Sequence, residues 1–344
     1  MIPTSNGHAR YRQLIVKYTL DWTGPSHSLV HLLRHLRRTH DITVLLPGTG
    51  PLNDAFDEDI RIVTLPSLDA HAIPAMVRTM RRERARLVYA NNTAGSSRNA
   101  CIAAHLAGLP FVCHVRGMGW RKSWSRLGYL RLSDAVIAVS EACAESVRRF
   151  ARPGRLHVVY NGVPAEGEEP GSTGTSDDGA RTALRAELGL TADAQIILGV
   201  AHVCSRKGQM HAVNAFARIA ADFPAAHLLL AGALTREADY VELVRGAARE
   251  AGLDARIHLL GFRSDVGGLY RAADVFLHTA VVDPQPRSVL EAMAAELPVV
   301  AFAVDGVAET VVDGTTGHLV RSGDSAGLAH ALGELLRDRE GRQR

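Results

Sequence analysis

The chain has 344 residues, of which 47% are hydrophobic and 22% are charged, with a formal net charge of only +3. A single core usually stops growing at about 250–300 residues, so this composition predicts two domains with separate cores. No stretch approaches the roughly 20 apolar residues of a membrane span and residues 1–18 hold no continuous apolar run, which argues against a helical membrane protein and predicts a soluble, cytoplasmic one.

Along the first half, short apolar runs bounded by turn residues alternate with amphipathic stretches, a pattern typical of βαβ units with a parallel sheet. Strands are expected at about 12–18, 42–46, 60–64, 86–90, 110–115, 135–139 and 156–160. Helices are expected near 26–39, 70–84, 96–107 and 141–151. These elements are predicted to form a first domain over residues 1–164.

Positive charge is concentrated in this first half. Residues 1–165 carry 22 Lys and Arg against 11 Asp and Glu, a net of +11, whereas residues 166–344 carry 17 against 25, a net of −8. A basic module suits an anionic partner such as phospholipid headgroups, a lipid-linked phosphate or nucleic acid. Arginines solvated on helix faces would give the same numbers, so both interpretations stay open.

One basic segment, RGMGWRKSWSRLGYLR (116–131), interleaves cations with Trp120, Trp124 and Tyr129. Cations and aromatic rings that meet water on one side and apolar groups on the other favour contact with an anionic membrane or a lipid-linked acceptor. The alternative is a loop that packs its tryptophans internally.

The regular alternation stops at residues 165–180, AEGEEPGSTGTSDDGA, which contain no aliphatic residue larger than alanine and are predicted to be a linker or flexible loop. It resumes over 181–344, the predicted second domain. Strands are expected at 195–201, 227–232, 256–261, 275–280 and 298–303. Helices are expected at 181–190, 208–222, 239–251, 265–271, 288–295 and 325–338. Ligands of such sheets bind beyond the carboxyl ends of the strands.

Two carboxylates lie eight residues apart in DPQPRSVLEAMAAELPVV (283–300): Asp283 just before the predicted helix and Glu291 about one turn inside it. A helix start offers unpaired N–H groups and the positive end of the macrodipole, so a phosphorylated ligand can rest there while two carboxylates hold neighbouring hydroxyls. Pro286 fits a helix start and Ser288 can cap it. This arrangement suits a nucleotide sugar; an ordinary N-terminus with a stabilising acid is the alternative for either carboxylate alone.

No metal site is predicted. Four cysteines lie mostly in apolar or alanine-rich segments without CxxC spacing, which predicts reduced core residues: Cys101, Cys113, Cys143 and Cys204. His27, His31 and His35 repeat every four residues, a spacing that puts three ligands on one helix face, but no acidic residue completes the set.

Seven motifs span nearly all of residues 156–320: VVYNGVP (158–164), SRKGQ (205–209), LLLAG (228–232), HLLGF (258–262), YRAADVFLHTA (270–280), DPQPRSVLEAMAAELPVVA (283–301) and DGVAETVVDGTTGHLV (305–320). In this order they resemble the nucleotide-sugar-binding domain of the family-4 retaining glycosyltransferases (glycosyl transferases group 1). The first half resembles the family more loosely, through DWTGPSHSL (21–29), GLPFVCHVRGM (108–118) and SDAVIAVSEA (133–142).

The resemblance implies the α/β GT-B architecture, in which two Rossmann-like domains with parallel sheets face each other across a cleft, acceptor-side first and donor-binding second. It implies transfer of a hexose-type sugar from a nucleoside diphosphate sugar to a glycan, lipid-linked or small-molecule acceptor, with retention at the anomeric carbon. No metal or other cofactor and no nucleic-acid partner are expected. The family also implies a role in cell-envelope polysaccharide synthesis, in the cytoplasm and on the inner face of the cell membrane.

The resemblance assigns donor contacts around the two carboxylates. Asp283, where the family most often has glutamate, would hold hydroxyls of the donor hexose, and Glu291 would accept hydrogen bonds from the ribose. The backbone from Pro286 through Arg287 to Ser288 would meet sugar and phosphate.

Lys207 is a candidate catalytic residue because the 39 lysines and arginines include only three lysines, Lys17, Lys122 and Lys207, and the last falls in a Lys-Gly turn after a strand. A compact ammonium suits a diphosphate leaving group, whose negative charge grows in the transition state. His202 occupies the place of the family's usual arginine, and Arg206 would supply the lost charge. A surface lysine is the alternative.

Three first-half residues and Glu309 complete the candidates. Gly24 would let the backbone approach the diphosphate, and a plain turn with the following proline is the alternative. His114 and Arg116 share a strand face; Arg116 better matches the family's catalytic histidine position, and a core histidine bonded to backbone is the alternative for His114. Glu309 would shape the donor loop, with helix capping as its alternative.

Two other functions remain open. His202, Asp283 and the end of the chain at Arg344, soon after the last expected helix, favour a non-catalytic nucleotide-sugar-binding regulatory subunit. A GT-B sugar-nucleotide epimerase would share the architecture. Turnover of donor with and without acceptor would distinguish these three functions.

Overall fold

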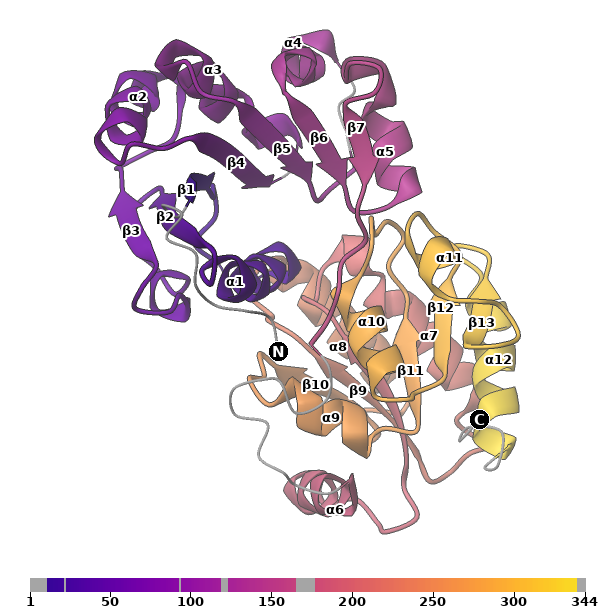
Figure 1. Cartoon of the computed structure of the whole chain (residues 1–344). Coiled ribbons are helices and arrows are strands. Elements are labelled where there is room, and N and C mark those ends of the chain that lie inside the picture. The colour runs from indigo at the N-terminus through magenta and orange to yellow at the C-terminus, as the bar shows by residue number, and fades with distance from the viewer. Residues whose placement is uncertain (1–10, 22, 93, 119–122, 165–176, 339–344) are drawn as a thin grey trace, which may run out of the picture. The chain divides into compact units, whose positions relative to one another are not determined.

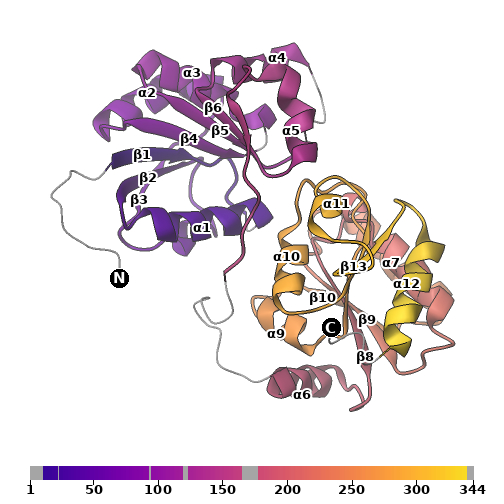
Figure 2. The same cartoon turned by 45° about the vertical axis from the view of Figure 1, so that its right-hand side comes forward.

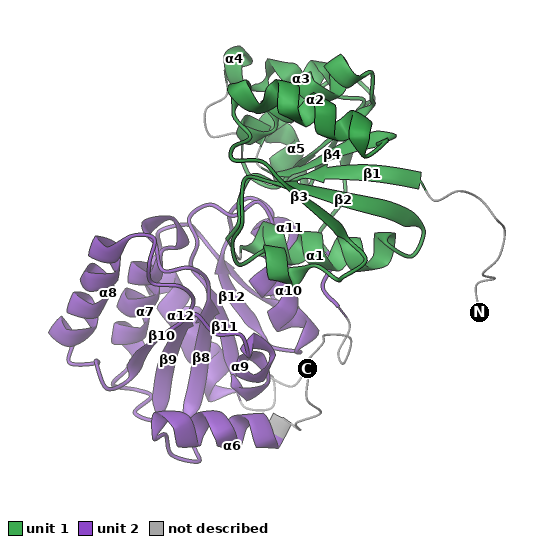
Figure 3. Cartoon of the chain, turned by 90° about the vertical axis from the view of Figure 1, so that its left-hand side faces the viewer, with its two compact units in different colours: residues 1–161 green, residues 162–344 purple. Residues whose placement is uncertain are grey.

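The computed structural model describes residues 11–21, 23–92, 94–118, 123–164 and 177–338. The chain divides into two compact units, residues 1–161 (unit 1) and 162–344 (unit 2), as Figure 3 shows. Residues 165–176 of the predicted linker lie outside the described residues. Residues 177–180 begin helix α6 (Asp177–Leu188), so the helix expected to start at 181 starts four residues earlier.

Unit 1 is a seven-stranded sheet in the order β3-β2-β1-β4-β5-β6-β7, and all of its neighbouring pairs are parallel. Its strands are β1 (Tyr11–Val16), β2 (His40–Leu46), β3 (Arg61–Thr64), β4 (Leu87–Asn92), β5 (Phe111–Val115), β6 (Ala135–Ala138) and β7 (Leu156–Val158). Its α-helices are α1 (Gly24–Leu36), α2 (Ile73–Arg82), α3 (Arg98–Ala107), α4 (Trp124–Leu127) and α5 (Glu141–Val147).

Helices cover both faces of this sheet, so its central strands are apolar on both sides. Alternate residues of a strand point to opposite faces. In β1, Leu14 and Val16 accordingly join the core under α2, α3 and α5, whereas Ile15 joins the core under α1. Figures 1 and 2 both show α1 alone on one face of the sheet and α2 and α3 on the other.

Unit 2 is a six-stranded parallel sheet in the order β10-β9-β8-β11-β12-β13. Its strands are β8 (Gln195–Val200), β9 (Ala226–Ala231), β10 (Ile257–Gly261), β11 (Val275–His278), β12 (Val299–Phe302) and β13 (Gly317–Val320). Its remaining helices are α7 (Gln209–Ile219), α8 (Ala238–Glu250), α9 (Val266–Ala272), α10 (Arg287–Ala294), α11 (Val307–Thr310) and α12 (Ser325–Arg337).

Two cores sandwich the sheet of unit 2. Ile197, Leu228 and Val300 pack with residues of α7, α8 and α12 on one face. Leu198 and Phe276 pack with residues of α6, α9 and α10 on the other. The predicted α/β class with two parallel sheets is therefore confirmed.

Several boundaries differ from the predicted ones for local reasons. The helix expected at 70–84 is split: Asp69 accepts hydrogen bonds from the backbone of His71 and Ala72 in a short 3-10 turn, and α2 then begins at Ile73 with a proline in its first turn. Strand β13 and helix α11 were not predicted; the helix has four residues, about one turn, which is too short to show a helical period.

Within the described ranges no helix is long and apolar enough to cross a bilayer. Helices α1, α8 and α12 have 13 residues each, which is about 20 Å against a hydrocarbon core of about 30 Å.

Candidate functional site

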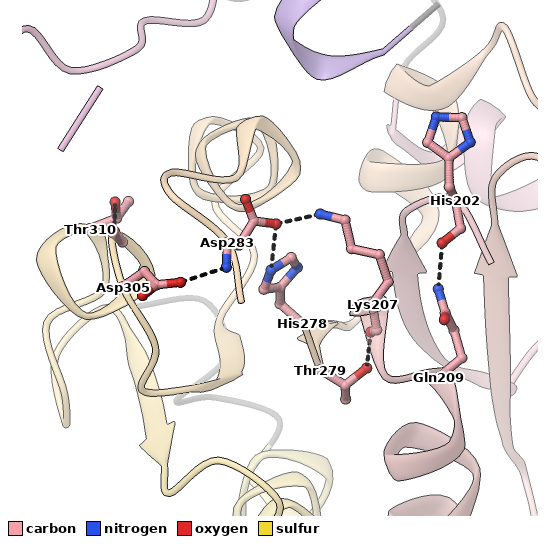
Figure 4. Close-up of polar contacts among 9 residues, drawn as sticks. His202, Lys207, Gln209, His278, Thr279, Asp283, Asp305 and Thr310 are labelled. Carbon is pink, nitrogen blue, oxygen red and sulfur yellow. Dashed lines mark hydrogen bonds and ion pairs between the residues drawn. The ribbon is translucent and has the colours of Figure 1, made fainter. Parts of the chain in front are cut away.

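Two predicted residues, Lys207 and Asp283, meet two that were not predicted, His278 and Asp305, at one edge of unit 2, where the adjacent strands β8, β11 and β12 have their carboxyl ends. Lys207 ends a 3-10 turn (Ser205–Lys207) after β8, and His278 is the last residue of β11. Asp283 lies in the loop between β11 and α10, and Asp305 lies in the loop after β12. Figure 4 shows these four side chains together.

Asp283 is the centre of the cluster. Its side chain is only 8% exposed, and its Oδ2 accepts a hydrogen bond from the Lys207 ammonium. The same oxygen lies 3.3 Å from Nε2 of His278, and the backbone N–H of Asp283 donates to Oδ2 of Asp305 over 3.0 Å. Oδ1 of Asp283 has no hydrogen bond with any described residue, so it can accept one from a ligand.

The charges of this cluster follow from burial and pairing. Burial alone would raise the pKa of Asp283, but the Lys207 ammonium and the contact with His278 hold that pKa well below its usual range. Burial lowers the pKa of His278, so its ring is neutral at pH 7 and presents Nε2 to the carboxylate. Burial also raises the pKa of Asp305, with the charges of Asp283 and Glu309 acting in the same direction.

Backbone contacts fix the turn that carries Lys207. The Thr279 hydroxyl donates to the carbonyl of Lys207 over 3.1 Å, and the N–H of Val281 donates to the carbonyl of Arg206 over 3.1 Å. Gly208 has φ +66°, and a Cβ there would lie 2.2 Å from the carbonyl oxygen of Thr279. The residue after Lys207 must therefore be glycine, because the turn presses against the β11 strand end.

Gln209 is a positioning residue that sequence reasoning missed. Its buried amide donates to the carbonyl of His202 over 3.0 Å and accepts from the N–H of Cys204 over 3.3 Å, which ties the loop ahead of Lys207 to the start of α7 (Figure 4). The signal was present in the motif SRKGQ, where a glutamine follows the Lys-Gly turn.

Glu291 lies one turn inside α10, as predicted, but both of its oxygens have protein partners. Oε1 accepts from Nε and Nη2 of Arg287 over 2.9 and 2.7 Å, and Oε2 accepts from the Tyr270 hydroxyl over 3.0 Å. A carboxylate has about four lone-pair sites, so one remains for a further donor. Nη1 of the buried Arg287 has no hydrogen-bond partner among the described residues.

The expected cap by Ser288 is wrong. Helix α10 begins at Arg287, so Ser288 lies inside the helix, and Pro286 occupies the capping position without a side-chain hydrogen bond. Proline has no side-chain acceptor, and the first-turn N–H groups of α10 are therefore left for water or an anion.

The other second-half candidates lie around this edge. Arg206 is half-buried beside Lys207. The pKa of Glu237 is lowered mainly by a hydrogen bond from the backbone of Ser205, and the charge of Arg206 lowers it further. The carbonyl of the half-buried His202 accepts the hydrogen bond from Gln209. Glu309 is exposed in the first turn of α11, and its charge helps to raise the pKa of Asp305.

In unit 1 the structure brings His114 and Arg116 together, as predicted. His114 is 6% exposed, and its Nδ1 pairs with the Tyr89 hydroxyl, so it is bonded to a side chain and not to backbone. The Arg116 guanidinium binds the amide oxygens of Asn91 and Asn161. The predicted catalytic set is therefore divided, with this pair in unit 1 and Lys207 with Asp283 in unit 2.

Gly24 opens α1, ahead of Pro25, so it does not form the plain turn that was the alternative to a diphosphate contact. A Cβ on Gly24 would meet no atom within 4 Å, so the structure shows no steric need for glycine there. In the basic aromatic segment, residues 119–122 lie outside the described part. Trp124 is 53% exposed with its ring against Phe150, whereas Tyr129 is buried and cannot contact a membrane surface.

Comparison with known proteins agrees with this fold. Residues 180–344 match the family described as Glycosyl transferases group 1, and residues 22–166 match Glycosyltransferase Family 4. The chain is 31% identical over 244 residues to alpha-maltose-1-phosphate synthase of Mycolicibacterium smegmatis, covering 67% of this chain and 61% of that protein. It is 27% identical to the lipopolysaccharide core biosynthesis glycosyltransferase LpsE of Rhizobium meliloti, covering 64% and 59%. The chain thus spans about three fifths of these relatives.

Two solved structures share the fold over nearly the whole chain. Anabaena HepE in complex with UDP and glucose has a TM-score of 0.84 and 25% identity, covering 97% of this chain and 92% of that one. Sucrose-phosphate synthase from Thermosynechococcus elongatus has a TM-score of 0.78 and 21% identity over the same shares of 97% and 92%, which shows the fold alone. With two family matches in chain order and two parallel sheets in this fold, the chain belongs to the group 1, family 4 glycosyltransferases of the GT-B superfamily.

Proposed function

We propose that this protein transfers a hexose-type sugar from a nucleoside diphosphate sugar to an acceptor hydroxyl, with retention at the anomeric carbon and without a metal ion. The observation that carries the proposal is the buried cluster of Lys207, Asp283 and His278 at the carboxyl edge of the unit 2 sheet. The HepE structures with UDP and glucose and with UDP-glucose support a nucleotide-sugar donor.

The cluster has the groups that such a donor needs. An ammonium has three donors, so Lys207 can hold Asp283 and still donate to a diphosphate oxygen. The uncapped first turn of α10 offers N–H groups to the same anion. As the bond to the anomeric carbon breaks, negative charge grows on the diphosphate, and these groups stabilise that charge.

Asp283 is suited to hold the sugar. Both of its side-chain contacts use Oδ2, which leaves Oδ1 to accept a hydrogen bond from a hexose hydroxyl. The neutral His278 keeps the carboxylate in place without competing for the diphosphate. Glu291, held by Arg287 and Tyr270, has one acceptor site left for a ribose hydroxyl.

The proton of the acceptor hydroxyl needs a base, and the departing diphosphate oxygen can take it directly. This route needs no pair of acids on either side of the scissile bond, unlike glycoside hydrolysis. The acceptor is a glycan, a lipid-linked or a small molecule, and similarity to LpsE supports a role in cell-envelope polysaccharide synthesis. We place this reaction in the cytoplasm, at the inner face of the membrane.

A panel of UDP-, GDP- and ADP-sugars, each with and without candidate acceptors, tests the proposal. We expect one donor to be consumed only when an acceptor is present, and we expect a metal chelator to leave this activity unchanged. NMR of the product should show an axial linkage when the donor sugar is axial, which is retention at the anomeric carbon. Donor isomerisation without acceptor would indicate the epimerase instead. Donor binding without turnover across all acceptors would indicate the regulatory subunit.

A further inference from the structure

A row of polar side chains lies at the carboxyl edge of the unit 1 sheet, where β1, β4 and β5 are neighbours. Val16 is opposite Ala90, and Asn91 is opposite His114, so Lys17, Asn91 and His114 form one row across the three strands. Residues in one row point to the same face, and so does Arg116, two positions after His114. We call Lys17, Asn91, His114 and Arg116 the Lys17 site.

Lys17 is the least expected member of this site. It is 2% exposed, and its ammonium has no hydrogen bond or ion pair with any described residue. Burial, with the charge of Arg116, lowers the pKa of Lys17 to about 8, so the side chain is still mostly protonated at pH 7. A buried cation without a counterion is unfavourable, and a bound anion would remove that penalty.

Arg116 brings a second positive charge, and two amide oxygens contact its guanidinium. Its Nε donates to Oδ1 of Asn91, and its Nη1 donates to Oδ1 of Asn161 over 2.6 Å. Amide oxygens orient a guanidinium without neutralising it. Asn91 in turn donates to the carbonyl of Pro25 over 3.2 Å, so the site adjoins the first turn of α1, which has no capping side chain.

His114 supplies a neutral donor. Burial, with the charge of Arg116, lowers its pKa well below the usual value, so the ring is uncharged. Arg116 hydrogen-bonds the hydroxyl of Tyr89, and burial raises the pKa of this phenol to about 12, so it stays protonated. The phenol O–H therefore donates a hydrogen bond to Nδ1 of His114. This tautomer places the ring proton on Nε2, which is buried without a partner.

We propose that the Lys17 site binds a phosphomonoester group carried by the acceptor. A buried ammonium, a half-buried guanidinium, one unpaired N–H and a helix start match a group of charge −1.5 to −2 with three acceptor oxygens, as a phosphomonoester has at pH 7. The inference rests on the proposed function in one respect: it takes the phosphorylated ligand to be the acceptor.

Anion binding is tested first, on the full chain, without any donor. Calorimetry with sulfate at pH 8, in buffers of different ionisation enthalpy, is expected to show proton uptake by the wild type because the bound anion raises the pKa of Lys17. Sulfate itself does not titrate there. Lys17→Met, which is close in size, should lose the proton uptake and bind sulfate at least about 10-fold more weakly. Arg148→Met, at an exposed unit 1 cation, is the control and should bind as the wild type does.

The source of the phosphate is tested with two probes, glucose 1-phosphate in solution and vesicles that contain phosphatidic acid. Lys17-dependent binding of the first indicates a soluble phosphorylated acceptor, and Lys17-dependent binding of the second indicates a lipid phosphate. Sulfate and phosphate binding that is equal in wild type and Lys17→Met, or absent proton uptake by the wild type, would overturn the proposal.

The same variants separate this inference from the proposed function. UDP binding is expected to be equal in wild type, Lys17→Met and Arg148→Met, because none of these changes lies in unit 2. A chain that binds sulfate through Lys17 but never turns over a sugar nucleotide refutes the proposed function and leaves the anion site standing. Sugar transfer in which Lys17→Met has the wild-type KM for a phosphorylated acceptor refutes the anion site alone.

Discussion

Breaking the buried pair of Lys207 and Asp283 should affect stability and activity in different ways. The two side chains are 14% and 8% exposed, and removal of one partner of such a pair leaves the other charge buried without a counterion. Breaks of this kind lower the free energy of unfolding by about 3–5 kcal/mol, whereas replacing both partners with neutral groups is often close to neutral. We therefore expect about 3 kcal/mol for Lys207→Met and for Asp283→Asn, and less for the double variant than for either single one.

The double variant should regain stability relative to the single variants, but it should not regain activity. Each single variant and the double variant should lose about 100-fold or more in kcat/KM, the scale for one positioned electrostatic group. A surface change in the same unit, Arg245→Met at the exposed pair with Glu242, should leave both quantities within the experimental error.

The assay uses the placement of the tryptophans. All three, Trp22, Trp120 and Trp124, are in unit 1, so urea unfolding followed by tryptophan fluorescence reports that unit, whereas circular dichroism reports both. The variants should shift a dichroism transition and leave the fluorescence transition in place. Additive losses in the double variant would show that the two side chains are not coupled, and near-normal kcat/KM in Lys207→Met would remove Lys207 from the site.

Three further outcomes are expected. The pKa of Lys17 falls from 10.5 to about 8 on folding, so between these pH values the unfolded chain binds more protons than the folded one. The free energy of unfolding of the wild type should therefore rise by about 3 kcal/mol from pH 8 to 10.5 relative to that of Lys17→Met. Parallel curves of unfolding free energy against pH for the two proteins would contradict this. Gly208→Ala should lower both stability, by about 1–3 kcal/mol, and kcat/KM, whereas Gly246→Ala in open space on α8 should be neutral or stabilising in urea melts; equal effects would refute the steric argument. Tyr270→Phe should raise the donor KM with little change in kcat, since it frees Glu291 to move; an unchanged KM would separate Glu291 from the donor.

Sequence reasoning was most successful where chemistry depends on spacing along one segment. It placed Asp283 just before α10 and Glu291 one turn inside it, and it singled out Lys207 because lysine is rare in this chain. The same argument from the rarity of lysine applies to Lys17, a charged residue at the end of an apolar strand, but it was not used for that residue.

Long-range contacts could not be read in this way. Asp305 meets Asp283 only because β11 and β12 are neighbours in the sheet, and no spacing along the chain encodes that adjacency. Tyr129 looked interfacial beside its arginines, but its hydroxyl donates to the carbonyl of Ala94 in the core. The observed cap, Pro286, lies two residues before the predicted cap Ser288, which is within the usual uncertainty of a helix start.

The most direct test is a crystal structure of the chain with an intact or hydrolysed nucleoside diphosphate sugar at the edge of the unit 2 sheet. We expect Nζ of Lys207 within about 3 Å of a diphosphate oxygen and Oδ1 of Asp283 hydrogen-bonded to a hexose hydroxyl. A nucleotide bound elsewhere, with the ion pair of Lys207 and Asp283 unchanged and the first turn of α10 in contact with water alone, would contradict the account.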